Sequence, residues 1–153
     1  MPQSPYNYAL DLLAARAYSA KELGRKLAQK GAEPDELQAV LERLTTAGLL
    51  DDSRYALAFA RTKLLGPGAS TRRIKQELSK KGVDAEVATN AIDQVVQDEA
   101  IDTRDVVLRA AKKKLATMGD LDPITLRRRL YGFLARRGYD LDEIQSVVRE
   151  VLP

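Results

Sequence analysis

Basic side chains gather in three segments of this 153-residue chain, and the chemistry open to them is the binding of anions. Residues 70–81 hold five Lys or Arg against a single acid, residues 109–114 hold four and no acid, and residues 126–138 hold five and no acid. Guanidinium and ammonium groups bind phosphate or carboxylate oxygens through charge-assisted hydrogen bonds. The contact residues that we predict from charge placement are Arg25, Lys26, Arg72, Arg73, Lys75, Arg127, Arg128 and Arg136.

Nucleophilic and acid–base chemistry near neutral pH has little support in this sequence. The chain has no His and no Cys, the side chains that most often act as nucleophile, general base or zinc ligand. Asp51 and Asp52 are adjacent acids, but at the start of an expected helix they are explained more simply as a cap than as metal ligands. No Gly-rich phosphate-binding loop is present. We therefore expect a protein that is not an enzyme and that needs no metal and no cofactor.

One sequence pattern occurs three times along the chain, in residues 19–30, 70–81 and 126–137. Each copy ends in a basic residue followed by glycine, at Gly31, Gly82 and Gly138, with large aliphatic residues four and eight positions before the glycine. Self-similarity with a period near 50 residues indicates stacked copies of one supersecondary unit. The repetition alone therefore predicts an architecture of stacked repeats.

Helix signals fill each copy, and no segment shows the sustained alternation of a strand. We predict an all-α fold of three tandem three-helix repeats, which are helix-turn-helix-like modules in an elongated, curved array. The expected repeats are residues 1–50, 51–98 and 99–153. A domain of this size buries only about 60% of its unfolded surface, so neighbouring repeats should stabilise each other.

Several helix starts can be assigned from their capping residues. Ser19 and Glu22 have the spacing of a capping box, and Asp140 with Glu143 has the same spacing. Asp122 precedes a proline, which favours a helix start one turn earlier in the third copy than in the other two. These signals place the basic residues on the middle helix of each repeat.

Overall composition says less than the distribution of charge. The net charge is +3 and the isoelectric point is about 9.2, which is weak support for a polyanionic partner. No apolar run reaches the ~18 residues that a membrane span needs, so we expect a cytoplasmic protein without a membrane partner. A monomer is the expected state in solution.

Two other interpretations stay open at this point. Solvated helix faces use Lys and Arg as readily as Glu, so the basic residues need not bind anything. A helix-turn-helix-type transcriptional regulator could instead place its middle or third helices in the major groove of DNA. Residues 84–105 hold seven acids and one Arg, which argues against groove entry by the third helix of the second repeat.

The central part of the chain resembles a known family. The segments GLLDDSRYA (48–56), FAR (59–61) and RIKQELSKKGV (73–83) are similar to the central signature of bacterial RecX proteins. Residues 9–31 resemble the first repeat of that family and residues 133–148 its third, each less specifically. The resemblance covers nearly the whole chain, although residues 99–122 match only loosely.

The resemblance implies a function as well as a fold. RecX proteins are tandem three-helix repeats that modulate the RecA recombinase, usually negatively, in DNA repair, recombination and the SOS response. They bind in the groove of the RecA–single-stranded-DNA filament and limit its growth, ATP hydrolysis and strand exchange. The implied partners are therefore the RecA filament and single-stranded DNA, with duplex DNA left open. Reversing Arg72, Arg73 and Lys75 to Glu should then abolish inhibition.

Overall fold

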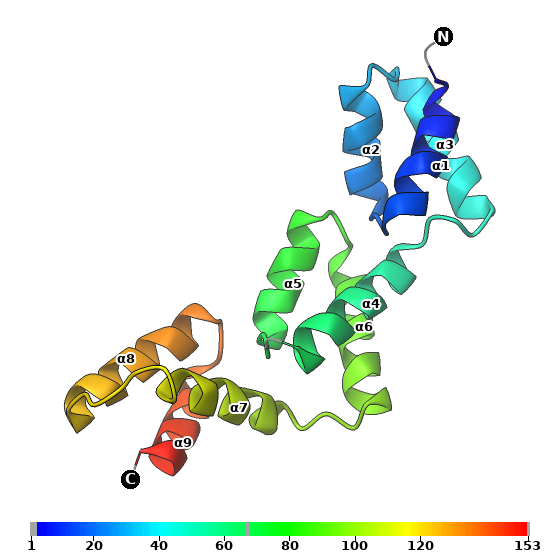
Figure 1. Ribbon diagram of the computed structural model, residues 1–153. Helices are drawn as coiled ribbons and strands as arrows, with labels where there is room; N and C mark the ends of the chain where they lie inside the picture. The colour runs from blue at the N-terminus through cyan, green and yellow to red at the C-terminus, as the bar shows by residue number, and fades with distance from the viewer. Residues whose placement is uncertain (1–2, 67, 153) are drawn as a thin grey trace.

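In the computed structural model, which describes residues 3–66 and 68–152, every regular element is an α-helix. The elements follow each other in groups of three, joined by short turns (Figure 1). The helices are α1 (Pro5–Ala15), α2 (Ala20–Gln29), α3 (Pro34–Thr46), α4 (Asp52–Leu65), α5 (Thr71–Lys80), α6 (Ala85–Asp98), α7 (Thr103–Leu115), α8 (Pro123–Arg136) and α9 (Leu141–Val151).

The helices begin where local chemistry favours a start. Ser19 Oγ accepts from the Glu22 N–H at 3.2 Å, and Glu22 Oε1 accepts from the Ser19 N–H at 3.1 Å. The capping box predicted at α2 is therefore complete. Asp122 caps α8, with a proline following it, and this helix starts a turn earlier relative to its closing glycine than α2 and α5 do. That prediction is confirmed too.

Three hydrophobic cores follow each other along the chain, one inside each group of three helices. Each core is built around an aliphatic pair of the middle helix, spaced four residues apart so that both side chains face inward. Fully burying one such side chain stabilises a fold by roughly 1.5–3 kcal/mol. The pairs are Leu23 with Leu27, Ile74 with Leu78, and Leu130 with Leu134, all 0% exposed.

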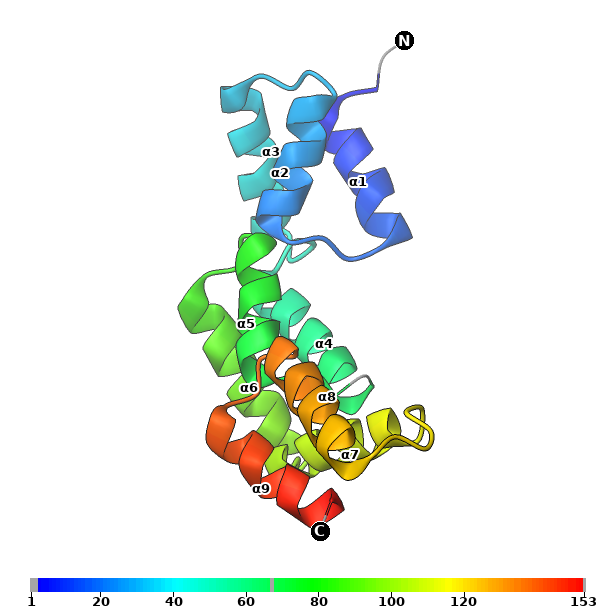
Figure 2. The same cartoon turned by 90° about the vertical axis from the view of Figure 1, so that its left-hand side faces the viewer.

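The three groups stack end to end into an elongated, curved array, with the two chain ends at its opposite extremes (Figure 1). The middle helices α2, α5 and α8 lie along one side of this array, the side that faces the viewer in Figure 2. The predicted fold class is confirmed. The exact repeat boundaries remain predictions, and their outer ends at residues 1–2 and 153 lie outside the described residues. Among the described helices, none is long and apolar enough to cross a membrane.

Candidate binding face and the joints between repeats

The residues predicted to make contacts lie on α2, α5 and α8, and all of their side chains are exposed. The three helices that carry them lie along one side of the array (Figure 2). The exposed residues predicted to make contacts are Arg25 and Lys26 on α2, Arg72, Arg73 and Lys75 on α5, and Arg127, Arg128 and Arg136 on α8.

Part of the positive charge of the second repeat is already paired. Arg73 Nε lies 3.3 Å from Glu77 Oε1, and Lys63 Nζ lies 3.8 Å from Glu77 Oε2. Such exposed pairs contribute little stability, but they lower the local positive potential. Arg72 and Lys75 form no ion pair with any other described residue. Of the three predicted contact residues on α5, these two therefore keep their full charge for a partner.

On α8 the structure separates residues that the sequence grouped together. The Arg127 guanidinium donates to the Leu152 carbonyl at 3.1 Å, which turns it toward the end of α9. Arg128 and Arg136 instead line a groove between α7 and α8. Lys114 and Arg129 line the same groove. Both belong to basic segments of the sequence, but neither is among the predicted contact residues.

Helical spacing could have found one of the two missed residues. Arg129 and Arg136 are seven positions apart on α8, which places them on one face of a helix. Lys114 lies on α7, so only the packing of α7 against α8 brings it to this groove. No pattern within the sequence of α8 could have pointed to it.

The same type of hydrogen bond is made at both joints of the array, between the first and second repeats and between the second and third. Ser19 Oγ donates to the Lys81 carbonyl at 2.5 Å, and Ser70 Oγ donates to the Arg137 carbonyl at 2.7 Å. Each serine is also the N-cap of its own middle helix, accepting from the backbone three residues on. A single hydroxyl thus starts one middle helix and binds the end of the next, which fixes how successive repeats are placed.

Glycine follows both acceptor carbonyls, and close packing requires it there. Gly82 and Gly138 have left-handed backbones, with φ of 80° and 89°. A Cβ on Gly138 would lie 2.7 Å from Ser70 Oγ, and a Cβ on Gly82 would overlap the Lys21 side chain. Gly31 has a similar φ of 95°, but nothing lies within 4 Å of a Cβ built there. The glycines at the joints are therefore needed for space as well as for conformation.

The joint between the first two repeats carries a second layer of polar contacts. Asp52 Oδ1 accepts from the Ala20 N–H at 2.9 Å, and Lys81 Nζ lies 3.7 Å from Glu22 Oε2. Tyr55 on α4 lies close enough to the Glu22 carboxylate for each to shift the pKa of the other. The capping-box carboxylate of α2 is thus also a bridge to the second repeat.

These contacts change the acidity of two groups at this joint. Burial by itself would raise the pKa of Glu22. The Ser19 N–H opposes this by hydrogen bonding, and the nearby Tyr55 side chain and the charges of Lys81 and Arg16 add to that effect, so the pKa lies below its usual value. Burial and the neighbouring Glu22 charge raise the pKa of Tyr55 to about 12.

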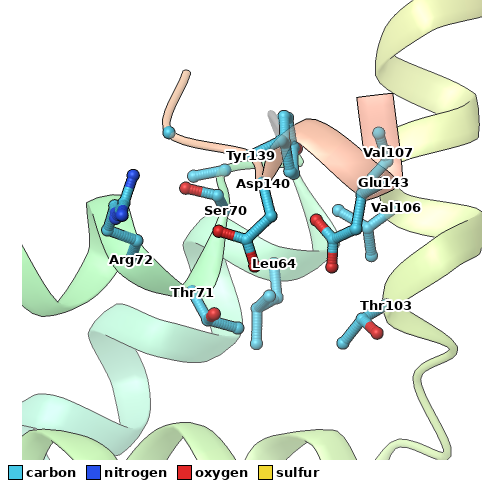
Figure 3. Close-up of a pocket in the computed structure, with 12 residues that line it drawn as sticks. Leu64, Ser70, Thr71, Arg72, Thr103, Val106, Val107, Tyr139, Asp140 and Glu143 are labelled. Atoms are coloured by element: carbon cyan, nitrogen blue, oxygen red, sulfur yellow. The ribbon is translucent and has the colours of Figure 1, made fainter. Parts of the chain in front are cut away.

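The joint between the second and third repeats is built differently. Thr103 stands where α4 has Asp52, and a cavity of about 100 Å³ lies between Thr103 and Thr71 (Figure 3). The buried Tyr139 hydroxyl closes one side by donating to the Gly68 carbonyl. Burial raises the pKa of the Tyr139 hydroxyl above its usual value.

The helix start predicted at Asp140 is confirmed, but the capping box expected there is absent. Asp140 is the N-cap residue of α9, but its side chain accepts no capping hydrogen bond, so it forms no capping box with Glu143. Both carboxylates line the cavity, on the side facing Thr71 and Thr103 (Figure 3). The spacing of a capping box is therefore not sufficient for one to form.

The fold and these surfaces define a class of protein: a tandem-repeat protein that carries basic helices along one side. Comparison with known proteins then specifies the family. Models of the first, second and third three-helix domains of RecX match residues 6–44, 51–92 and 102–148 in turn. The chain belongs to the RecX family of regulatory proteins.

Relatives match over most of their length. Regulatory protein RecX of Xanthomonas oryzae pv. oryzae (strain MAFF 311018) is 38% identical over 149 residues, covering 96% of this chain and 88% of the relative. Regulatory protein RecX of Amycolatopsis mediterranei (strain U-32) is 35% identical over 155 residues, covering 99% and 87%. The crystal structure of RecX from Lactobacillus salivarius superposes with a TM-score of 0.79 at 24% identity, covering 95% of this chain and 93% of the other, which supports the shared fold.

Proposed function

We propose that this protein modulates the RecA recombinase, mainly as a negative regulator, by binding the RecA–single-stranded-DNA filament. The observation that carries the proposal is membership of the RecX family over three consecutive domains. In this proposal the protein acts by occupying its binding site on the filament, and it catalyses no reaction. It works as a cytoplasmic monomer that limits filament growth, ATP hydrolysis and strand exchange.

A curved array suits a helical filament as a partner. Each repeat is held to the next through the same serine–carbonyl hydrogen bond, so the three basic helices keep a set spacing along one side. Several weak contacts in a row gain from effective concentration when their spacing matches that of the partner. Contacts from α2, α5 and α8 to neighbouring filament subunits or to the DNA between them would add in this way.

The third helices argue against a major-groove reader of duplex DNA. Their first turns contain Asp35 and Glu36 in α3, Glu86 in α6, and Asp142 and Glu143 in α9. Recognition helices place their N-terminal residues against base edges between two phosphate backbones. Acids at that position in every repeat would be repelled by the phosphates, so the transcriptional-regulator alternative is the weaker one.

The experiment that tests the proposal is a titration of this protein into RecA during single-stranded-DNA-dependent ATP hydrolysis. Binding to bare single-stranded DNA is measured alongside at the same salt concentration. We expect hydrolysis to fall at concentrations below those that coat bare DNA. A fall only after the bare DNA is saturated would mean simple competition for DNA, and the filament-binding proposal would then have to be abandoned.

A further inference from the structure

We propose that the groove between α7 and α8 is a binding site for the phosphodiester backbone of nucleic acid. This third-repeat groove is lined by Lys114, Arg128, Arg129 and Arg136, with Thr117 and Met118. The inference rests on the proposed function, because in a filament the strand held by the recombinase would be the natural ligand. It goes further by assigning the DNA contact to one repeat and to a named set of side chains.

Positive charge is concentrated in this groove. Four cationic side chains line it and no acid does, and none of the four forms an ion pair within the described residues, although the charge of Arg128 also acts on the Asp122 carboxylate outside the groove. On α5, in contrast, Arg73 is already paired with Glu77. Like charges held close together repel each other, and bound phosphate relieves that repulsion while releasing counterions.

The shape of the groove fits a strand rather than a small anion. Its volume of about 600 Å³ is open to solvent along the surface between the end of α7 and α8. Gly132 lies in the middle of the arginine face of α8, and a Cβ there would lie 3.1 Å from Arg136 Nη1. The glycine therefore leaves room for the Arg136 guanidinium to lie over the helix and face the groove. Guanidinium groups bind phosphate oxygens through two parallel hydrogen bonds.

The same residues are a poor match for an acidic protein surface. Protein interfaces centre on buried apolar and aromatic anchors, around which Arg is enriched and Lys is depleted. Met118 is the only large apolar side chain that lines the groove within the described part of the chain. Phosphate contacts need no apolar anchor and carry no sequence requirement, so a nucleic-acid backbone is the ligand that the lining favours. Single-stranded and duplex DNA share this chemistry, and experiment must separate them.

The test compares two variants with the same change of net charge. Arg129→Gln with Arg136→Gln removes two of the four cations of the groove. Lys112→Gln with Arg149→Gln removes two exposed cations of the same repeat that do not line the groove. Binding of fluorescent single-stranded and duplex oligonucleotides is measured by anisotropy without RecA, across a series of salt concentrations. Thermal unfolding confirms that both variants keep the fold.

We expect the groove variant to bind DNA about tenfold more weakly or worse, with no dependence on sequence. The slope of log affinity against log salt should become shallower by about 0.7 on single strands, and about 0.9 on duplex, for each phosphate that is no longer neutralised. The control variant should keep the slope of the unmodified protein. Weaker binding confined to single strands identifies them as the ligand, and equal weakening on both identifies backbone in general.

Two results would overturn the inference. Equal weakening by the control variant would mean that net charge, not the groove, governs DNA binding. Unchanged DNA binding by the groove variant, together with weaker inhibition of RecA, would assign the groove to protein contact. In that second case the proposed regulation of RecA would stand while the inference fails, so the two failures are distinguishable.

Discussion

Ser19 and Lys81 are 62 positions apart in the chain, yet the hydroxyl of the first binds the carbonyl of the second at 2.5 Å. The equivalent pair in the next joint, Ser70 and Arg137, is related in the same way. Both hydroxyls are buried and both also cap a helix. A buried serine hydroxyl of this kind therefore contributes to holding successive repeats together at both joints.

Replacing Ser70 by alanine should destabilise the protein by about 2–3 kcal/mol. The N-cap accounts for ~1 kcal/mol of this, and loss of the hydrogen bond to the half-buried Arg137 carbonyl accounts for most of the rest. Urea unfolding measures the change in the free energy of unfolding. Ser70→Asp separates the two roles, because an ionised carboxylate caps the helix but cannot donate. If Ser70→Asp were as stable as the unmodified protein, the joint hydrogen bond would contribute nothing.

Alanine at Gly138 should cost more than alanine at Gly31. Both positions have a left-handed backbone, which costs a non-glycine residue ~1–2 kcal/mol. Only at Gly138 would the new Cβ also press on Ser70 Oγ, and such overpacking adds about 1–3 kcal/mol. Chemical unfolding of the two variants in parallel gives the difference directly. Equal destabilisation would show that the joint can open without cost.

Acid should weaken the joint between the first and second repeats. The pKa of Glu22 is lowered in the folded protein, so its contribution to stability is present above the pKa of the unfolded chain and is lost as pH falls through the folded value. Stability measured by urea unfolding should therefore decline on going from pH 6 toward pH 3. Glu22→Gln should be less stable at neutral pH and should show a shallower decline. A parallel decline in the variant would assign the acid sensitivity to other carboxylates.

Reversal of two unpaired cations of α5, as Arg72→Glu with Lys75→Glu, should abolish inhibition of RecA ATP hydrolysis. Arg73 is better left unchanged, because it pairs with Glu77 and an acid at both positions would destabilise the helix. The matched control is Lys112→Glu with Arg149→Glu, which changes the charge equally on the third repeat. Full inhibition by the α5 variant, with its fold intact, would remove α5 from the binding face.

Local signals predicted most of the fold. The capping box at Ser19, the early start after Asp122 and the closing glycines depend on neighbours a few residues away, which a sequence displays directly. The aliphatic pair in each middle helix predicted the three cores for the same reason. Asp140 shows the limit, since its side chain faces a cavity formed with another repeat.

The candidate site was less accessible to sequence reasoning. Spacing placed the basic residues on middle helices, but only the stacking of repeats determines that these helices share one side. The split between Arg127 and Arg128 arises because the Leu152 carbonyl lies within reach of one guanidinium and not the other. Lys114 joins the groove through packing between helices. Contacts of this kind depend on which helices pack together, so they produce no periodic pattern in the sequence.

The serine–carbonyl hydrogen bond between repeats is directional, because the serine of one repeat donates to the carbonyl at the end of the middle helix of the next. This direction determines how longer arrays could be built. The second repeat carries both halves of the joint, with Ser70 as donor and the Lys81 carbonyl beside Gly82 as acceptor. The third repeat starts its middle helix with Asp122, which when ionised has no proton to donate. Longer arrays should therefore be made by inserting copies of the second repeat between the first and third. Copies placed after the third would lack a donor for the joint.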